Sequence, residues 1–182
     1  MSFNVIGIGE ILWDLLPAGK QLGGAPANFA WHARGLGARS GVISRVGRDA
    51  LGAEVLRRLE SLGLPIAAIQ TDASAPTGTA GVELAADGQP RFAIHENVAW
   101  DRLALEATAL AAAGAADAVA FGTLGQRCAR ARRTIQALLA AVRPGALRIL
   151  DLNLRQNYYS RELIESSLRL ANIVKCNDAE LP

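Results

Sequence analysis

The sequence predicts an α/β protein built on a mostly parallel sheet that is flanked by helices. Short apolar segments alternate with segments whose apolar residues recur at helical spacing, as expected when strands and helices follow one another. One stretch, residues 66–96, breaks this alternation with the pattern of a hairpin. The 182 residues are 51% hydrophobic and 20% charged, as in ordinary globular domains, which excludes a disordered or collagen-like chain.

The first part of the chain predicts two strands and two helices. Pro26 suits a first helical position, where its missing N–H is no loss, and Gly37 suits the end of the same helix. Asp49 can cap the second helix through a side-chain oxygen. The expected strands span residues 4–9 and 40–46, and the expected helices span residues 26–37 and 49–63.

A small antiparallel β lid is expected next, contributed mainly by residues 66–100. An Asp87-Gly88 pair between two alternating segments predicts its hairpin turn. The alternation of helices and strands then resumes and continues to the end of the chain. Strands are expected at residues 118–121, 147–152 and 173–176, and helices at residues 103–113, 127–142 and 161–170.

The charges and the rare residue types exclude several classes of function. Lys and Arg total 19 against 17 Asp and Glu, a net charge of +2 without a long basic run, so no nucleic-acid partner is expected. Two distant cysteines, Cys128 and Cys176, and only two histidines argue against a structural zinc site and a disulfide scaffold. No signal peptide and no run of ~20 apolar residues is present, which predicts a cytoplasmic protein without membrane contact.

Two glycines at a helix entrance form the first candidate ligand site. Gly23 and Gly24 let a ligand approach the backbone closely, and the helix that follows offers free N–H donors at its start. Asn28, in the first turn, can exchange hydrogen bonds with a polyol. Glu10 and Asp14 lie just past the first strand, where they can meet sugar hydroxyls. The alternative interpretation is a glycine turn, a capping residue and a solvated loop.

Two later strand ends also carry polar side chains. Asp151, Asn153 and Arg155 alternate along the chain, so they point to one side if the strand continues. Asn177 and Glu180 follow the next strand, and Glu180 can hold a magnesium-bound water near phosphates. Because ligands of open α/β sheets bind outside the carboxyl ends of strands, these positions are expected to carry function.

Other polar residues have ordinary structural explanations. His95 is expected on the lid, and a group of arginines is expected to form a solvated helix face. That group is Arg127, Arg130, Arg132 and Arg133. No Ser/His/Asp arrangement and no GxxxxGK[ST] loop occurs, which disfavours hydrolase triads and P-loop chemistry.

Together these segments resemble the PfkB family of carbohydrate kinases, also called the ribokinase family. The match to the family's N-terminal signature includes Gly37 and Gly47 at the expected offsets, and the later strand ends resemble the DxNxR string of fructokinase-like members and the family's NxxE motif. The matching segments are residues 9–14, 23–30, 45–52, 151–155 and 177–180.

The resemblance implies a ribokinase-like fold, ATP and Mg²⁺ as cofactors, and a lid that covers the sugar and makes a homodimer contact. It also implies two groups of site residues. The substrate-binding group is Asp14, Gly23, Gly24, Asn28, Asn153 and Arg155. The nucleotide- and phosphate-binding group is Lys175, Asn177 and Glu180, with Glu180 near Mg²⁺ through water.

The family's second signature, a Gly-Ala-Gly-Asp string that carries the catalytic base, should follow Glu180 and is absent. No catalytic residue is therefore expected in this chain, and the adenine pocket would lie beyond it as well. Residues 1–182 are expected to be the N-terminal part of one ribokinase-like domain, incomplete at the C-terminus and inactive alone. The missing strands would leave an apolar sheet edge exposed.

The resemblance implies that the full protein is an ATP-dependent sugar kinase of the fructokinase type. Ala25 stands where ribokinases usually carry lysine, so ribose is a less expected acceptor. A 2-keto-3-deoxygluconate kinase or a nucleoside kinase of the same fold remains open. So does a different class of protein, a truncated non-catalytic module for sugar binding or assembly.

Overall fold

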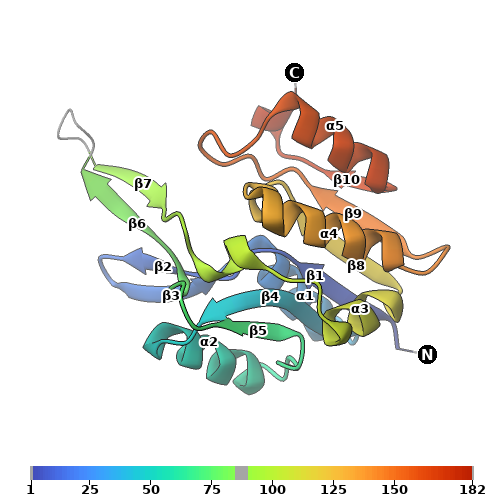
Figure 1. Ribbon diagram of the computed structural model, residues 1–182, viewed down its shortest axis with the longest axis horizontal. Helices are drawn as coiled ribbons and strands as arrows, with labels where there is room; N and C mark the ends of the chain where they lie inside the picture. Colours follow the sequence, from blue (N-terminus) through green and yellow to red (C-terminus); the bar gives the residue numbers. More distant parts are fainter. Residues whose placement is uncertain (1, 85–89, 182) are drawn as a thin grey trace.

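A six-stranded parallel sheet forms the body of the molecule in the computed structural model, which describes residues 2–84 and 90–181 (Figure 1). The strand order is β10-β9-β8-β1-β4-β5, and every neighbouring pair is parallel. The predicted mostly parallel sheet is confirmed. The strands are β1 (Asn4–Ile8), β4 (Arg39–Gly47), β5 (Ile69–Asp72), β8 (Ala118–Gly122), β9 (Leu147–Asp151) and β10 (Ile173–Lys175).

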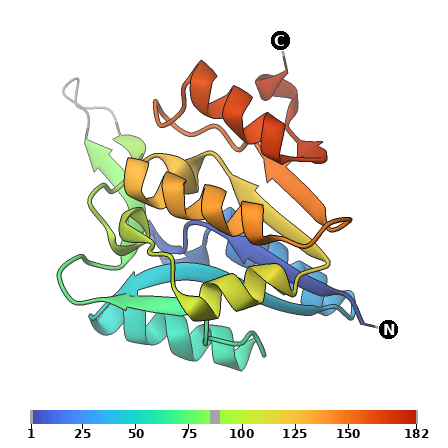
Figure 2. The ribbon, with the colours of Figure 1, turned by 45° about the vertical axis from the view of Figure 1, so that its right-hand side comes forward.

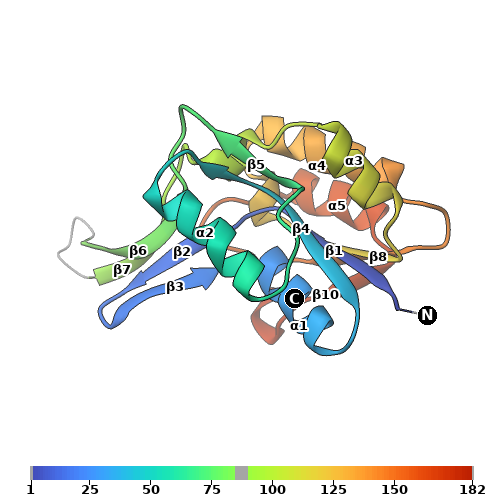
Figure 3. The ribbon, with the colours of Figure 1, turned by 90° about the horizontal axis from the view of Figure 1, so that it is seen from below.

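Helices cover both faces of this sheet. Three of them lie in a row across one face (Figure 2), and the other two lie on the opposite face (Figure 3). The first group is α3 (Ala107–Gly114), α4 (Ala129–Ala141) and α5 (Arg161–Leu170), and the second is α1 (Ala25–Gly35) and α2 (Ala50–Ser61). Because the central strand β8 is covered on both sides, it is apolar throughout and entirely buried.

A second sheet of four strands projects from the body (Figure 1). It is mixed and not antiparallel throughout as expected, because one of its three strand pairs is parallel. We call this sheet the lid. Its order is β3-β2-β6-β7, so β7 is an edge strand. The strands are β2 (Leu12–Leu16), β3 (Gly19–Gly23), β6 (Gly78–Leu84) and β7 (Pro90–Ile94). An apolar cluster that includes Leu12, Ile94 and Trp100 joins the lid to the body.

The segment from residue 66 to residue 100 does not go to the lid alone. Its first strand, β5, pairs with β4 in the main sheet, whereas β6 and β7 form the hairpin. The lid also contains β2 and β3, which form a hairpin around Pro17. The sequence pattern did not predict this hairpin because each of its strands is only five residues long. The predicted Asp87-Gly88 turn lies outside the described residues.

Most helix ends follow the predicted signals. The Asp49 side chain accepts a 2.7 Å hydrogen bond from the Gly52 N–H at the start of α2. One prediction was wrong at its start: α3 begins at Ala107 and not at residue 103. A short 3₁₀ turn, η1 (Ala99–Arg102), precedes it, and buried Leu103 belongs to the core outside any helix. Two further 3₁₀ turns are η2 (Leu124–Gln126) and η3 (Asp178–Glu180).

The last strand is the least covered part of the sheet. Ile173 and Val174 of β10 are 41% and 47% exposed, and β10 is an edge strand. An apolar edge was expected there, and it is present. Within residues 2–84 and 90–181, no helix is both long enough and apolar enough to cross a membrane. Cys128 and Cys176 are both free thiols.

Candidate functional site

A cavity of about 340 Å³ opens where the carboxyl ends of β1 and β9 meet the start of α1 and the lid. Five of the six predicted substrate-binding residues line it, which brings together segments more than 100 residues apart in the sequence. Those five are Asp14, Gly24, Asn28, Asn153 and Arg155. The remaining lining residues are Glu10, Leu12, Ala25, Ala80, Ile94 and Leu124.

The entrance of α1 is built so closely that only glycine fits. Gly24 has φ 110° and precedes the helix, and a Cβ added to it would lie 2.5 Å from the carbonyl oxygen of Glu10. A Cβ on Gly7 of β1 would likewise meet the carbonyl of Pro26. The start of α1 therefore rests directly on the central strand, and its N–H groups face the cavity end of the sheet.

Glu10 contacts the start of α1 from the cavity floor, at the end of β1. Its Oε1 accepts a 3.3 Å hydrogen bond from the Ala25 N–H, and no partner among the described residues lies on its buried Oε2. Burial raises the pKa of Glu10 to about 7, against the lowering effect of backbone N–H groups including that of Ala25. Asp151 raises this pKa further and Arg155 lowers it. Glu10 therefore changes charge near neutral pH at the floor of the cavity.

Asp14 reaches the cavity from the lid. It lies on β2 and is half-buried, and this partial burial raises the pKa of its carboxyl above the usual value. Gly23, the sixth predicted residue, does not line the cavity. It makes room instead, because a Cβ at that position would collide with the Asp14 carboxylate.

The loop after β9 supplies the opposite wall. Asn153 has φ 44°, a left-handed conformation that asparagine tolerates better than most residues, and its side chain lines the cavity. Arg155 is exposed, and the one hydrogen bond that its side chain makes within the described part of the chain runs from Nη1 to the Leu154 carbonyl. A guanidinium with free donors is thus positioned beside two carboxyl groups and two amides.

The predicted phosphate-binding residues form a separate group outside the cavity. Lys175 Nζ lies 2.9 Å from Asp151 Oδ1, and both side chains are partly exposed. Asn177 and Glu180 form a capping box, in which Asn177 Oδ1 accepts from the Glu180 N–H and Glu180 Oε2 accepts from the Asn177 N–H at 3.0 Å. Glu180 Oε1 also accepts a 2.8 Å bond from the Leu154 N–H.

These bonds define how Glu180 could meet a cation. Although burial raises the pKa of Glu180, the N–H groups of Asn177 and Leu154 and the charges of Lys175 and Arg155 bring it below its usual range, so the carboxylate stays ionised. Both of its oxygens already accept backbone hydrogen bonds, which leaves room for a metal-bound water more readily than for a direct metal bond. Residues 2–84 and 90–181 contain no cluster of three or more acidic, His or Cys side chains that could hold an ion alone.

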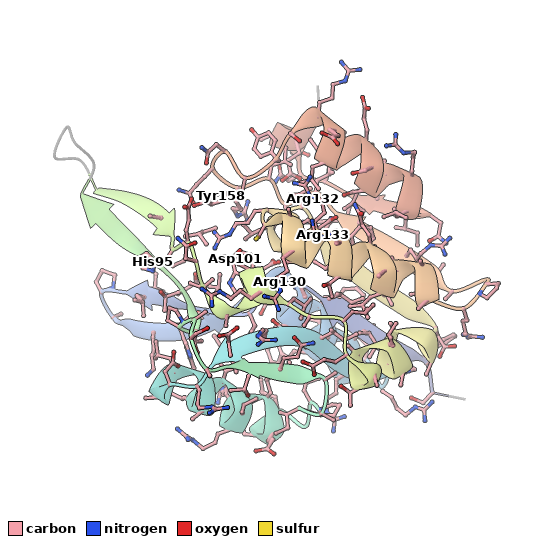
Figure 4. All side chains as sticks on the ribbon, viewed as in Figure 1. His95, Asp101, Arg130, Arg132, Arg133 and Tyr158 are labelled. Atoms are coloured by element: carbon pink, nitrogen blue, oxygen red, sulfur yellow. The ribbon has the colours of Figure 1, made fainter. Side chains whose placement is uncertain are left out.

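One prediction about the arginines was wrong. Arg127 does not belong to a solvated face, because its side chain is only 6% exposed and forms an ion pair of 2.8 Å with buried Asp101. Figure 4 shows Asp101 at the junction of lid and body, whereas Arg133 lies over α4. The pairing joins residues that are 26 positions apart, so no local sequence signal could reveal it.

The parallel α/β body, the glycine-bounded cavity at its strand ends and the β lid together define the ribokinase-like class of folds. A family model described as "pfkB family carbohydrate kinase" matches residues 18–182. The chain therefore belongs to the PfkB family of carbohydrate kinases.

Known proteins support this assignment along almost the whole chain. The chain is 31% identical to the fructokinase of Escherichia coli over 99% of its length and 62% of that protein's length. The crystal structure of an uncharacterized sugar kinase from Pyrococcus horikoshii is 28% identical, has a TM-score of 0.84, and covers 97% of this chain and 64% of that one. The same kinase has also been solved in complex with ATP, with a TM-score of 0.82 over 93% of this chain and 62% of that one. The chain thus spans about 60% of the length of the curated relatives it matches.

Proposed function

We propose that the protein is an ATP-dependent sugar kinase of the fructokinase type, and that this chain holds the acceptor sugar. The observation that carries the proposal is the convergence of Asp14, Asn28, Asn153 and Arg155 on one cavity of about 340 Å³. A volume of this order lies within the ~300–1,000 Å³ of small-molecule sites. Carboxylate and amide groups on opposite walls can accept from and donate to the hydroxyls of a monosaccharide at the same time.

The same arrangement favours one placement of the sugar relative to the nucleotide. The sugar would lie between the α1 entrance and the lid, with the nucleotide phosphates towards Arg155, Lys175 and Asn177. Glu180 would orient a water on Mg²⁺, which when bound offsets the negative charge of the phosphates. Closure of the lid would exclude water and suppress hydrolysis of ATP. No residue of the chain is proposed as the catalytic base.

Two alternative acceptors are 2-keto-3-deoxygluconate and a nucleoside, since kinases of the same fold act on each of them. Calorimetry with D-fructose, 2-keto-3-deoxygluconate, D-ribose and adenosine separates them. We expect D-fructose to bind most tightly to the chain and to lose its affinity in Asn28→Ala. Tightest binding of adenosine would overturn the fructokinase assignment and leave the fold assignment intact.

Transfer itself is tested by a coupled assay with ATP, Mg²⁺ and the same sugars. We expect the 182-residue chain to bind sugar without turnover, because none of its residues is proposed as the catalytic base. Robust turnover by this chain would contradict that part of the proposal. Sugar binding with no turnover by any longer form of the protein would favour the rival function, a non-catalytic sugar-binding module.

We propose that the protein forms a homodimer in which the lids of two copies contact each other. Leu15 and Leu16 of β2 and Val82 of β6 are exposed apolar side chains on this small sheet, and a second lid could cover them. Analytical ultracentrifugation of the chain and of Val82→Lys tests the proposal. A monomer at micromolar concentration in both cases would contradict it.

A further inference from the structure

The loop after β9, residues 152–160, contacts three parts of the molecule that the proposed function uses separately. Its Leu154 N–H is bonded to Glu180 in the η3 turn, and its Asn153 and Arg155 line the cavity. Beyond these residues, the same loop reaches the edge of the lid. That last contact has no role in the function described so far.

The contact with the lid consists of two hydrogen bonds to one residue. The Ile94 N–H, at the end of β7, donates to Gln156 Oε1 at 3.2 Å, and the Tyr158 hydroxyl donates to the Ile94 carbonyl at 3.1 Å. Ile94 faces Ala80 of β6, while the neighbouring ladder bond runs from the His95 N–H to the Thr79 carbonyl. Both polar groups of Ile94 therefore point to the open edge of the lid, where Gln156 and Tyr158 satisfy them.

Arg127 fixes Tyr158 in this position. The guanidinium lies 4.7 Å from the Tyr158 ring and 4.0 Å from the Trp100 ring, as a cation between two aromatic faces. Its Nη2 donates to the His95 carbonyl at 2.6 Å, one residue beyond Ile94, and its Nε donates to Asp101. Figure 4 shows His95, Asp101 and Tyr158 grouped where β7 enters the body.

The chemistry of the group suits a stable contact. Burial, followed by a hydrogen bond to the Glu96 carboxylate and by the charge of that group, raises the pKa of Tyr158, so its hydroxyl stays protonated. The loop also holds Gln156 at φ 47°, a left-handed conformation that a free loop would leave readily. The bonds to Ile94 oppose that relaxation.

We propose that Gln156, Tyr158 and Arg127 form a latch that couples the lid to the sugar cavity. Gln156 and Tyr158 are positioning residues: they bind the lid edge through the same loop that presents Asn153 and Arg155 to the sugar. The proposal rests on the proposed function, since it takes the cavity to be the sugar site. Lid position and cavity occupancy then form one equilibrium, because the loop and β7 share the two hydrogen bonds of Ile94 and moving one away from the other breaks them.

The test measures hydrogen exchange of the Ile94 amide by NMR in Tyr158→Phe, with Tyr159→Phe as the matched control. Tyr158→Phe keeps the ring on Arg127 and removes only the hydroxyl, whereas Tyr159 is exposed and lies outside the latch. Without sugar, we expect Ile94 to exchange at least tenfold faster in Tyr158→Phe and at the unmodified rate in Tyr159→Phe. Equal exchange in the two variants would overturn the latch.

A second variant addresses the amide of the loop. Gln156→Asn keeps an amide that tolerates a left-handed backbone but shortens the side chain by one methylene, so it should lose the bond to Ile94. We expect the same rise in exchange as in Tyr158→Phe. Unchanged protection of Ile94 in Gln156→Asn would overturn the role of Gln156.

The coupling itself is tested by adding D-fructose. We expect saturating D-fructose to slow Ile94 exchange at least threefold in the unmodified chain and in Tyr159→Phe, and not in Tyr158→Phe. A purely structural tyrosine would leave this response intact, and an intact response in Tyr158→Phe would overturn the coupling. Failure of the unmodified chain to bind any of the sugars would instead overturn the proposed function, and the exchange rates without sugar would still decide whether the latch exists.

Discussion

The two parts of the candidate site are held in different ways. Asn28 follows a helix entrance that rests on the central strand, where even a methyl group on Gly24 would collide with backbone. Asp14 reaches the cavity from the lid, and Asn153 and Arg155 reach it from the loop after β9. Lys175, Asn177 and Glu180 stand on the exposed edge strand β10 and the short η3 turn, held by side-chain caps and one partly exposed ion pair. The proposed acceptor site is therefore anchored at a closely packed helix entrance, whereas the proposed phosphate site depends on the least covered edge of the sheet.

The largest expected effect comes from Gly24→Ala. The substitution meets the Glu10 carbonyl and forces φ 110° on a residue with a Cβ, so we expect a loss of roughly 2–4 kcal/mol in unfolding free energy. D-Fructose affinity should fall at least tenfold. Gly37→Ala is the control, because Gly37 has φ 89° with open space around it, and strain alone should cost about 1 kcal/mol there. Equal losses in urea unfolding would show that the helix entrance is not closely packed.

The next effect concerns Glu10→Gln and pH. The pKa of Glu10 rises from 4.5 to about 7 on folding, so between those values the folded chain binds more protons than the unfolded chain. Stability from this group must then fall as pH rises from about 5 to 7, by at most about 3 kcal/mol. Glu10→Gln should remove that decline and be the more stable protein at pH 8. Thermal unfolding at pH 5 and pH 8 checks this, and parallel pH profiles would contradict the burial of an ionisable Glu10.

Asp14→Asn should separate affinity from stability. A carboxylate that accepts from a sugar hydroxyl contributes roughly 1.5–3 kcal/mol, so we expect about a 10- to 100-fold loss of D-fructose affinity. Burial raises the pKa of Asp14, which means that ionisation slightly destabilises the fold at neutral pH, and Asn should leave the melting temperature unchanged or higher. The control Asp178→Asn, in the η3 turn, should keep full affinity in calorimetry. A similar loss in both variants would remove the distinction between the two parts of the site.

The smallest effect is expected from Lys175→Ala. Its ion pair with Asp151 is more than half exposed on the lysine side, and such pairs contribute about 0.2–1 kcal/mol. Urea unfolding should show a loss in that range, with D-fructose affinity unchanged. A marked loss of sugar affinity would place Lys175 in the acceptor site rather than on the phosphate side.

The sequence predicted those features that local signals encode. Asp49 as a helix cap, Gly24 at a helix entrance and α5 from residue 161 to residue 170 each follow from a few neighbouring residues, and the structure has them. The strand-end rule, with the family resemblance, also identified five residues that meet in one cavity.

The remaining features depend on contacts between distant segments. β5 belongs to the main sheet through its pairing with β4, which lies more than 20 residues earlier in the chain. Arg127 is buried because Asp101 and the rings of Trp100 and Tyr158 surround it. The same holds for the pKa of Glu10, since burial dominates it and the charges that act on it, Asp151 and Arg155, lie far away along the sequence. The spacing of residue types along the chain cannot predict these contacts between distant segments.

The central claim is that the cavity, and not the β10 edge, binds the acceptor sugar. Titration of the isotope-labelled chain with D-fructose, followed by amide NMR, tests it most directly. We predict saturable shifts at Gly24, Asn28 and Asn153, with Lys175 and Asn177 unchanged. Saturable shifts confined to the β10 edge, or none at the three cavity residues, would contradict the claim.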